Sequence, residues 1–590
     1  MKTNHKTTWD LSLIYKSATD PKIEQDLKKV EAAFAAFAKK YQTDKSHLTS
    51  PLKLKQALKD YEVLENLPIS NGYLYFNYQQ DLDSRDKKLE AKLNQLEARL
   101  QKTSNLILFF PIELAKIEVS KQREFLASKE LIPYRYYLER LFKEGKHTLS
   151  TAEEKILNLM SLPAKSLWIR GNENLVTEST IKWEGRDLPI PSAIGKIPSL
   201  PLKKRRALHQ AVVTKLKEIS QTSENELNAI VTHKKISDEL RGFTKPYEAT
   251  TLGYQTDLET VESLVKTVTK HFSIAKRFYK AKAKIHGLKQ MTYADRAAEA
   301  GKLKKEMPFT QAVETVKSAF LKVDPIYQEM FEGFLTNGQI DVYPKLGKRG
   351  GAYCSSQYGL PTYILLNHQN NFDSVMTLAH ELGHAFHGAL SFKHQPAFYR
   401  DYTIATAEVA STLFENFVFD EVLPTLSPQE QIIALHDKIM GSVQTIFRQI
   451  ACFNFEVELH QTIRREGHLP KDKIAALMNK HMQSYLGPIF KLTPDDGYFY
   501  VYWSHLRRFF YVFSYAFGEL VSNALYEEYK KDEEFKSKIK EFLSAGGSAT
   551  PEDIFKSIGI DVREPKFFEL GLKKIENDIK KLERAIKTLK

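Results

Sequence analysis

The chain has 590 residues, of which 42% are hydrophobic and 27% are charged, the balance of an ordinary globular protein. Its net charge of +13 comes from 86 basic and 73 acidic residues that are spread along mixed-sign segments, so a solvated basic surface is favoured over nucleic-acid binding. With two cysteines and no apolar run long enough to cross a bilayer, the composition predicts neither a disulfide framework nor a membrane protein.

Helical patterns fill the first part of the chain. Residues 23–41 place apolar side chains at spacings of three and four, and residues 85–103 repeat this pattern among dense charge. Short extended pieces are predicted at 174–177 and 180–183, and a run of prolines follows from Pro189. The change of pattern indicates a boundary between two regions shortly after these extended pieces.

We place this boundary near residue 190. It divides the chain into an N-terminal helical region, 1–190, and a second region, 191–590, in which helical patterns resume at 203–242 and 257–286. Length alone would suggest three or four domains, but two lobes around a cleft fit the chain equally well.

Two short strands precede the most informative helix. Residues 340–343 are a β candidate, and residues 363–367 form the best predicted strand of the chain. The Asn-rich turn that follows offers Asn371 or Asp373 as the cap of the next helix.

The tail from residue 572 is predicted to be an amphipathic helix. Its apolar face consists of Leu572, Ile575, Ile579, Leu582, Ile586 and Leu589. We expect this face to dock on the body of the protein, with binding to a membrane surface as the alternative.

The helix after the Asn-rich turn carries the motif H-E-x-x-H, from His380 to His384, inside an apolar stretch. Positions i and i+4 lie on one face of an α-helix, so both imidazoles can reach one ion. Glu381 projects about 100° around the helix, where it can act on a water activated by the metal without binding the metal. The alternative is a buried helix that carries two histidines by accident.

Gly383, inside the motif, destabilises a helix by about 1 kcal/mol relative to alanine. Its presence predicts that another backbone, or the substrate, passes close to the helix at this point.

A catalytic zinc needs a third protein ligand and an open fourth position. The metzincin continuation is absent, because His387 and Leu390 stand where it requires glycine and histidine. A glutamate at thermolysin-like spacing is also absent, because Thr403 and Ile404 occupy those positions. The next strong candidate is Glu408.

Glu408 lies on a predicted helix, and Ser411, Thr412 and Glu415 share its stripe at helical spacing. A carboxylate among apolar neighbours is costly to bury unless it is paired or bound to metal. We therefore predict Glu408 as the third ligand, with a surface glutamate as the alternative. Ser411, Thr412 and Glu415 are the candidates for orienting the histidines, whereas His387 is expected to be structural.

These motifs resemble the M3 family of zinc metallopeptidases, and within it oligoendopeptidase F. The resemblance covers about residues 200–590 and is weaker over the N-terminal helices. The stretches that carry it are 380–387, Glu408 in its Ala-Glu-Val-Ala-Ser-Thr context, 350–356, 505–518 and, at the start of the chain, 9–15.

The resemblance implies a mainly α, two-lobed metallopeptidase with a small β-sheet beside the H-E-x-x-H helix. A deep substrate channel holds one Zn2+ per chain at its floor in this family, and folded proteins cannot enter it. Gly350, Gly351, Ala352 and Tyr353 resemble the strand that lines the channel, where glycines let a peptide backbone approach and pair.

The resemblance also supplies candidates for stabilising the oxyanion that peptide hydrolysis creates. His505 is the candidate for one hydrogen-bond donor, and Tyr511 and Tyr515 are candidates for the other. Phe513 stands where relatives often have tyrosine, so the choice between the two tyrosines stays open. The alternative for this stretch is a stripe of aromatic core residues.

The sequence thus predicts a zinc-dependent endopeptidase that cleaves internal bonds of short unstructured oligopeptides, with Glu381 as the general base. We expect a cytoplasmic protein, a monomer or weak homo-oligomer, that binds neither nucleic acid nor membrane. Two alternatives stay open: a carboxypeptidase or dipeptidase on the same fold, and a basic helical scaffold or RNA-binding protein that carries a decorative motif.

Overall fold

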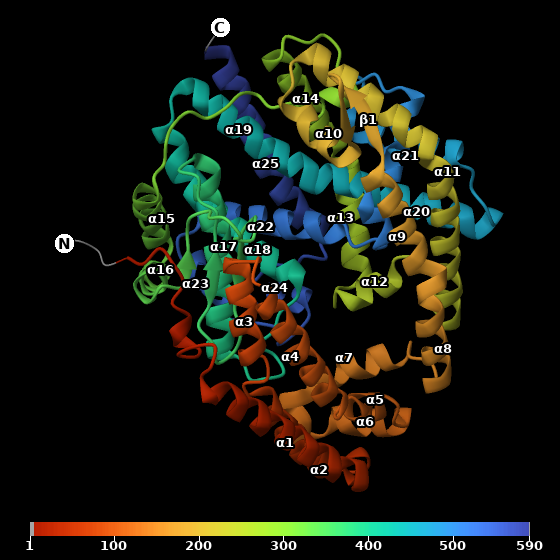
Figure 1. Ribbon diagram of the computed structural model, residues 1–590, viewed down its shortest axis with the longest axis vertical. Coiled ribbons are helices and arrows are strands. Elements are labelled where there is room, and N and C mark those ends of the chain that lie inside the picture. The colour runs from red at the N-terminus through yellow and green to blue at the C-terminus, as the bar shows by residue number, and fades with distance from the viewer. Residues whose placement is uncertain (1–4, 589–590) are drawn as a thin grey trace.

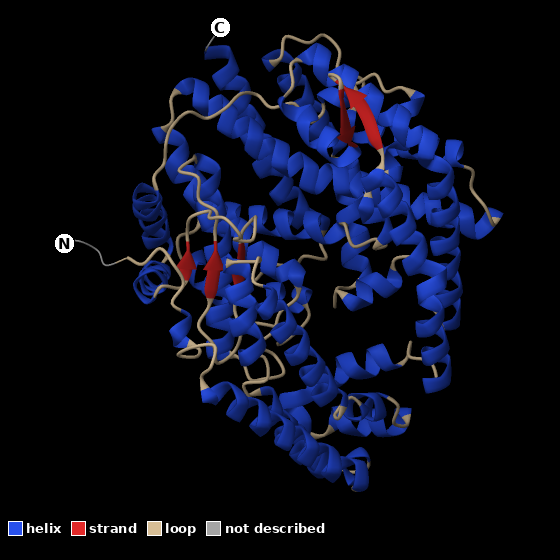
Figure 2. Ribbon diagram, in the orientation of Figure 1, coloured by secondary structure: helices blue, strands red, loops and turns tan. Residues whose placement is uncertain are grey.

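The computed structural model describes residues 5–588, and helices dominate it (Figures 1 and 2). The N-terminal helices are α1 (Pro21–Thr43), α2 (Pro51–Glu65), α3 (Asn71–Leu82), α4 (Lys87–Asn105), α5 (Phe109–Ala115), α6 (Val119–Ala127), α7 (Arg135–Gly145), α8 (Thr151–Ser161) and α9 (Leu167–Glu178). They are followed by a hairpin of β1 (Thr180–Trp183) and β2 (Arg186–Pro189).

The rest of the chain contains sixteen more α-helices within the described residues. They are α10 (Ile190–Lys196), α11 (Leu202–Leu240), α12 (Glu248–Gly253), α13 (Leu258–Lys270), α14 (Phe272–Ile285), α15 (Phe309–Val323), α16 (Pro325–Asn337), α17 (Phe372–His394), α18 (Ile404–Val422), α19 (Pro428–Ser442), α20 (Gln449–Glu466), α21 (Lys471–Leu486), α22 (Phe513–Lys531), α23 (Phe535–Ser544), α24 (Pro551–Ser557) and α25 (Pro565–Thr588). A π-helical turn, η8 (Val443–Arg448), joins α19 to α20.

Most of the helices predicted from periodicity are confirmed. The patterns at 23–41, 85–103 and 203–242 correspond to α1, α4 and α11. The pattern at 257–286 is two helices, α13 and α14, which meet at His271.

The extended piece predicted at 174–177 is wrong, because these residues form the last turn of α9. Asn172 and Val176 are the buried positions of this helix and lie one turn apart, which is the spacing of a helix that packs by one face. The piece at 180–183 is β1, as predicted.

A three-stranded sheet consists of β3 (Ile340–Asp341), β4 (Tyr353–Ser355) and β5 (Tyr363–Leu365) in the order β3-β5-β4. Strand β5 is parallel to β3 and antiparallel to β4, with Cys354 opposite Ile364. Helix α17 packs against β4 and β5. The prediction of a small sheet beside the H-E-x-x-H helix is confirmed.

The start of the chain is attached to this sheet. The indole Nε1 of Trp9 donates to the carbonyl of Ile364 over 2.8 Å, and the hydroxyl of Tyr363 donates to the carbonyl of Asp10, also over 2.8 Å. The backbone N–H of Val342 donates to the carbonyl of Thr7. Residues 7–10 therefore line the sheet that supports α17.

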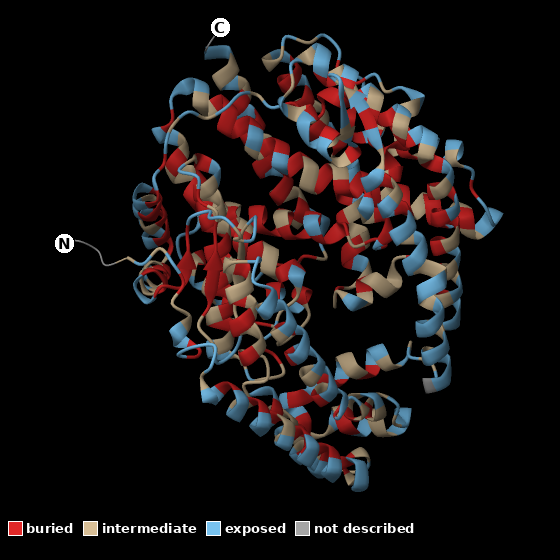
Figure 3. Cartoon of the chain, viewed as in Figure 1, coloured by how far each residue is buried: buried red, intermediate tan, exposed pale blue. Residues whose placement is uncertain are grey.

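The buried hydrophobic residues form one large core and two smaller ones. Figure 3 shows which parts of the helices are buried. The large core runs from Val176 to Leu582. One small core lies among α1, α2 and α5–α7, at the lower end of Figure 1, and the other lies between α1, α3, α4 and the three-stranded sheet. Tyr363 and Leu365 of β5 belong to one of the small cores. The prediction of a mainly α, two-lobed fold is confirmed, and the boundary near residue 190 stays a prediction.

The predicted tail helix is confirmed as α25, which begins at Pro565. Its residues Leu572, Ile575, Ile579 and Leu582 are buried, and the helix packs on α22, α19, α14 and α13. Leu589 lies outside the described residues. Across 5–588, none of the helices has the length and apolarity that a membrane span requires.

The contact between α25 and α22 depends on Gly571. A Cβ at this position would lie 2.4 Å from the backbone oxygen of Leu520, which cannot move without shifting α22. We expect Gly571→Ala to lower stability by about 1–3 kcal/mol, the usual range for overpacking, seen as a lower midpoint of thermal unfolding. Gly195→Ala is the control, because a Cβ at Gly195 in α10 meets no atom within 4 Å. A Gly571→Ala midpoint equal to that of this control would contradict the contact.

Candidate metal centre

Helix α17 presents two histidines to one point. The side chain of Asn371 caps the helix by accepting from the N–H of Ser374, which selects Asn371 from the two predicted caps. His380 and His384 then lie one turn apart, and their Nε2 atoms are separated by 3.2 Å. Two nitrogen lone pairs at this distance repel each other unless a proton or a cation lies between them.

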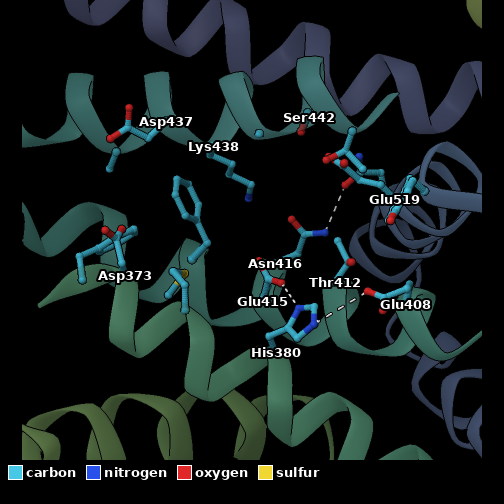
Figure 4. A pocket seen from close by; sticks show the side chains of 18 of the residues that line it. Asp373, His380, Glu408, Thr412, Glu415, Asn416, Asp437, Lys438, Ser442 and Glu519 are labelled. Atoms are coloured by element: carbon cyan, nitrogen blue, oxygen red, sulfur yellow. Dashed lines mark hydrogen bonds and ion pairs between the residues drawn. The ribbon is translucent and has the colours of Figure 1, made fainter. Parts of the chain in front are cut away.

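Helix α18 supplies the third donor. Thr403 caps this helix, and Glu408 follows in its second turn. A carboxylate oxygen of Glu408 lies 3.9 Å from Nε2 of His380 (Figure 4). The other lies 4.0 Å from Nε2 of His384. The structure thus brings together the three residues that the sequence nominated, with ligand atoms within 4.8 Å of one another.

The donor set fits a zinc ion. With metal–ligand bonds of about 2.1 Å and tetrahedral angles, neighbouring donor atoms are about 3.4 Å apart, close to the 3.2–4.0 Å found here. Two imidazoles and one carboxylate are the ligands of a common type of catalytic zinc site, which leaves a fourth position open.

Gly383 makes the meeting of α17 and α18 possible. A Cβ at this position would lie 2.6 Å from Cα of Ser411 and 2.9 Å from the carbonyl oxygen of Ala410. The predicted close approach is therefore confirmed, and the partner is the backbone of α18. Gly518 on α22 has a similar role from the other side, because its Cβ would lie 3.0 Å from Cβ of Glu408.

Of the three residues proposed to orient the histidines, Glu415 contacts one directly. Nδ1 of His380 donates to Oε1 of Glu415 over 2.5 Å, which leaves the lone pair of Nε2 directed at the metal position. The hydroxyl of Ser411 donates to the carbonyl of Glu408 and lies 3.5 Å from its Oε2. Thr412 lines the cavity beside these groups (Figure 4).

Without metal the two histidines differ in charge. Burial lowers the pKa of His380, but the hydrogen bond and the charge of Glu415 outweigh burial and raise this pKa to about 9. Burial, together with the charge of His380, lowers the pKa of His384 to about 3. His380 therefore holds a proton that a metal ion would have to displace, whereas neutral His384 is free to coordinate.

His387 is not part of this group. Its ring stacks on Tyr402, with centroids 3.6 Å apart and planes 10° apart, and it is 1% exposed. The expectation that His387 is structural agrees with this position.

Glu381 is buried on the side of α17 that faces β4. Burial raises the pKa of its carboxyl to about 7, and the backbone amide of Cys354 acts in the opposite direction. A carboxyl with a pKa near neutrality can both take up and release a proton at physiological pH, which is what a general base that later acts as an acid requires.

A cavity of about 440 Å³ opens at the metal position (Figure 4). His380, Glu408, Glu415 and Tyr515 line it, together with residues of α19 and α22. Glu519 also lines it and was missed by the sequence analysis, although it follows Tyr515 by one helical turn. Burial raises the pKa of Glu519 to about 7.

The three oxyanion candidates form one cluster. Nδ1 of His505 is hydrogen-bonded to the hydroxyl of Tyr511, which accepts from the hydroxyl of Tyr515 over 3.5 Å. Burial lowers the pKa of His505 to about 4, so the imidazole is neutral near pH 7. Tyr515 connects this cluster to the metal cavity, because it lines that cavity while the other two do not.

The segment that leads to this cluster is strained. Phe509 and Phe510 have φ of 51° and 61°, a left-handed conformation that costs about 1–2 kcal/mol for each residue with a Cβ. Thr250 donates to the carbonyl of Phe509, and the N–H of Phe510 donates to Glu456, so two side chains hold the strained residues in place.

The four residues predicted to bind substrate lie at the edge of the sheet. Gly350, Gly351 and Ala352 lead into β4, which begins at Tyr353. Strand β4 pairs with β5 on one side only, so its other edge has backbone groups that are not paired within the sheet.

Comparison with known proteins gives the class of the protein. Residues 113–178 match the sequence profile of Oligopeptidase F, and residues 202–573 match that of Peptidase family M3. The protein is therefore a peptidase. The second match spans more than half of the chain, and the chain belongs to peptidase family M3.

Relatives are similar over nearly the whole chain. An oligoendopeptidase F homolog of Lactococcus lactis is 25% identical over 98% of this chain and 97% of its own length. The oligopeptidase PepF of Bacillus subtilis is 25% identical over 88% of this chain and 79% of its own length.

Solved structures share the fold. A protein from Chlamydophila abortus has a TM-score of 0.89 at 23% identity, covering 99% of both chains. Oligoendopeptidase-F from Enterococcus faecium has a TM-score of 0.68 at 18% identity, covering 96% of this chain and all of that one.

The close packing at Gly383 can be tested through metal binding. We expect Gly383→Ala to push α18 away from α17, to move Glu408 out of reach, and to weaken zinc binding by at least about tenfold. Gly441→Ala is the matched control, because Gly441 lines the same cavity and a Cβ there meets nothing within 4 Å. Titration of the metal-free proteins with zinc measures both affinities. Equal affinities would show that the approach of the two helices does not position the glutamate.

The contact of Glu415 with His380 predicts a pH dependence. Zinc competes with the proton on His380, so affinity should rise with pH until the pKa of about 9 is passed. In Glu415→Gln the pKa of His380 should fall, so the rise of zinc affinity with pH should end at a lower pH. At a pH above the pKa of His380 in both proteins, the variant should still bind zinc about tenfold more weakly. Calorimetric titrations over a range of pH measure the dependence. If zinc affinity stopped rising at the same pH in both proteins, the proposed role of Glu415 would be contradicted.

Proposed function

We propose that the protein is a zinc-dependent endopeptidase that hydrolyses internal peptide bonds of short unstructured oligopeptides. The convergence of His380, His384 and Glu408 from two helices carries this proposal. A chance pair of histidines would not need a glycine that brings a glutamate from a second helix to the same point. Membership of peptidase family M3 supports the same conclusion.

His380, His384 and Glu408 would hold the zinc, and Glu415 would orient His380. When bound, zinc polarises the scissile carbonyl and makes water a stronger acid. Glu381 would take the proton from the attacking water and return it to the leaving amine, as its position on α17 between the two histidines allows.

Tyr515 would donate to the oxyanion from the metal cavity, and His505, which lines the neighbouring cavity, stays a candidate for the other donor. A neutral His505 that accepts from Tyr511 at Nδ1 keeps its hydrogen on Nε2 and can donate it. Tyr515 is favoured over Tyr511 for the second donor, because Tyr515 lines the metal cavity and Tyr511 supports His505.

The peptide would bind as an added strand along residues 350–353. The unpaired edge of β4 offers backbone donors and acceptors. Cys354 of this strand lies next to Glu381 of α17. Extended backbone is required for this pairing, which favours unstructured oligopeptides over folded proteins.

The cytoplasm is the proposed place of action. Cys354 and Cys452 are both free thiols, and Cys452 is fully buried. Burial raises the pKa of Cys354 to about 12, so its thiol stays protonated and unreactive beside the site.

The role of Glu381 is tested by Glu381→Gln. We expect this variant to keep its zinc, because Glu381 is not among the ligands, and to lose activity by a factor of about 10²–10⁴. Metal analysis and turnover of a quenched fluorescent peptide measure the two properties. Substantial activity in the zinc-loaded variant would reject Glu381 as the base.

A peptide blocked at both termini separates the proposal from a carboxypeptidase or dipeptidase. An endopeptidase cuts it, whereas enzymes that need a free terminus do not. Mass spectrometry of the products, with and without a chelator, gives the cleavage sites and the metal dependence in one experiment.

A further inference from the structure

A second cavity, of about 660 Å³, lies next to the oxyanion cluster. His505, Trp503, Arg296 and Arg448 line it, and the metal site uses only the first of these. The cavity also contains the buried Asn172 of α9.

Two guanidinium groups in this cavity have no anionic partner among the described residues. Arg296 is 8% exposed, and its Nε and Nη1 are buried without a hydrogen-bond partner. The adjacent Asp295 cannot neutralise it, because Arg205 and Arg206 already bind both of its oxygens. Nε of Arg448 is also buried without a partner, and its guanidinium lies 4.2 Å from the ring centroid of Trp503.

A third arginine shows the usual arrangement by contrast. Arg507 lines the same cavity, but it forms two hydrogen bonds of 2.9 and 2.7 Å with the buried carboxylate of Glu226. An uncompensated buried charge is strongly unfavourable, so buried arginines are normally paired in this way. Of the described residues that line the cavity, only Glu173 carries a carboxylate, and its side chain is exposed. The cavity is thus equipped for an anion from outside.

This cavity is adjacent to the metal cavity. Thr445 lines the metal cavity and Arg448 lines the second one, and they lie one turn apart on η8. The cluster of Tyr515, Tyr511 and His505 also separates the two, with Tyr515 on the metal side and His505 on the other. For a peptide held at the metal, the arginines would therefore lie beyond this cluster.

We propose that this cavity is a subsite for a carboxylate of the peptide substrate, held by Arg448 and Arg296. The inference rests on the proposed peptidase function at the metal site. Guanidinium groups bind carboxylates through paired hydrogen bonds, and the guanidinium of Arg448 packs on the ring of Trp503. The carboxylate belongs either to the C-terminus of the peptide or to an acidic side chain.

The experiment measures peptide binding to the full-length Glu381→Gln protein by fluorescence anisotropy. Four labelled peptides of one sequence differ in two features: a free or amidated C-terminus, and glutamate or glutamine at internal positions. We expect at least about tenfold tighter binding of either the free-acid or the glutamate form, and this difference identifies the source of the carboxylate.

Two variants in the same background then test the assignment. Arg448→Gln should abolish the preference for the carboxylate while the amidated glutamine peptide binds as before. Glu173→Gln removes a negative charge that repels a carboxylate, so it should increase the preference for the carboxylate peptide. The two variants are therefore expected to change this preference in opposite directions. Arg448 is only partly buried, and correct folding of its variant is checked by that unchanged affinity for the neutral peptide.

The absence of any preference in the parent protein, or a preference that survives Arg448→Gln, would overturn the subsite. Hydrolysis by the wild-type protein is recorded separately. Peptides that bind with the expected preference but are not cut would reject the proposed function and leave the subsite in place.

Discussion

The close contact of α17 with α18 is the constraint on which the site depends. The two helices approach at Gly383 until a single methyl group would collide with the backbone of Ser411. Because Glu408 is one turn before Ser411 on α18, this approach sets the distance between its carboxylate and the two imidazoles. Gly518 lets α22 pack closely against the same glutamate. Three helices are therefore positioned by two residues without side chains.

Electrostatics add a second layer to this packing. The cavity gathers several carboxyl groups, and Glu415 and Glu408 face the same imidazole (Figure 4). Negative charge near buried histidines favours a cation, which in the absence of metal is the proton on His380. The second cavity has the opposite character, because two of its arginines have no carboxylate partner among the described residues. The proposed cation and anion sites thus lie on either side of the cluster of Tyr515, Tyr511 and His505.

Local patterns were sufficient to predict the helices, the strand at 363–367 and the three ligand candidates. H-E-x-x-H places its two histidines by helical geometry alone, and Gly383 is a local anomaly that signals a close neighbour. The extended piece at 174–177 was wrong because its side chains fit a strand as well as a helix, and only the packing of Val176 decides between them. Arg296 and Arg448 could not be predicted, since their lack of partners arises only when distant segments meet.

The attachment of the first residues to the sheet bears on how the chain folds. Trp9 donates to Ile364 across a sequence separation of 355 residues, and one N-terminal core is completed only by Tyr363 and Leu365. During synthesis, the segment that leaves the ribosome early has to wait for a strand made much later. This core is therefore completed only after β5 has been made, and such long-range closure is slow compared with the formation of the helices around it.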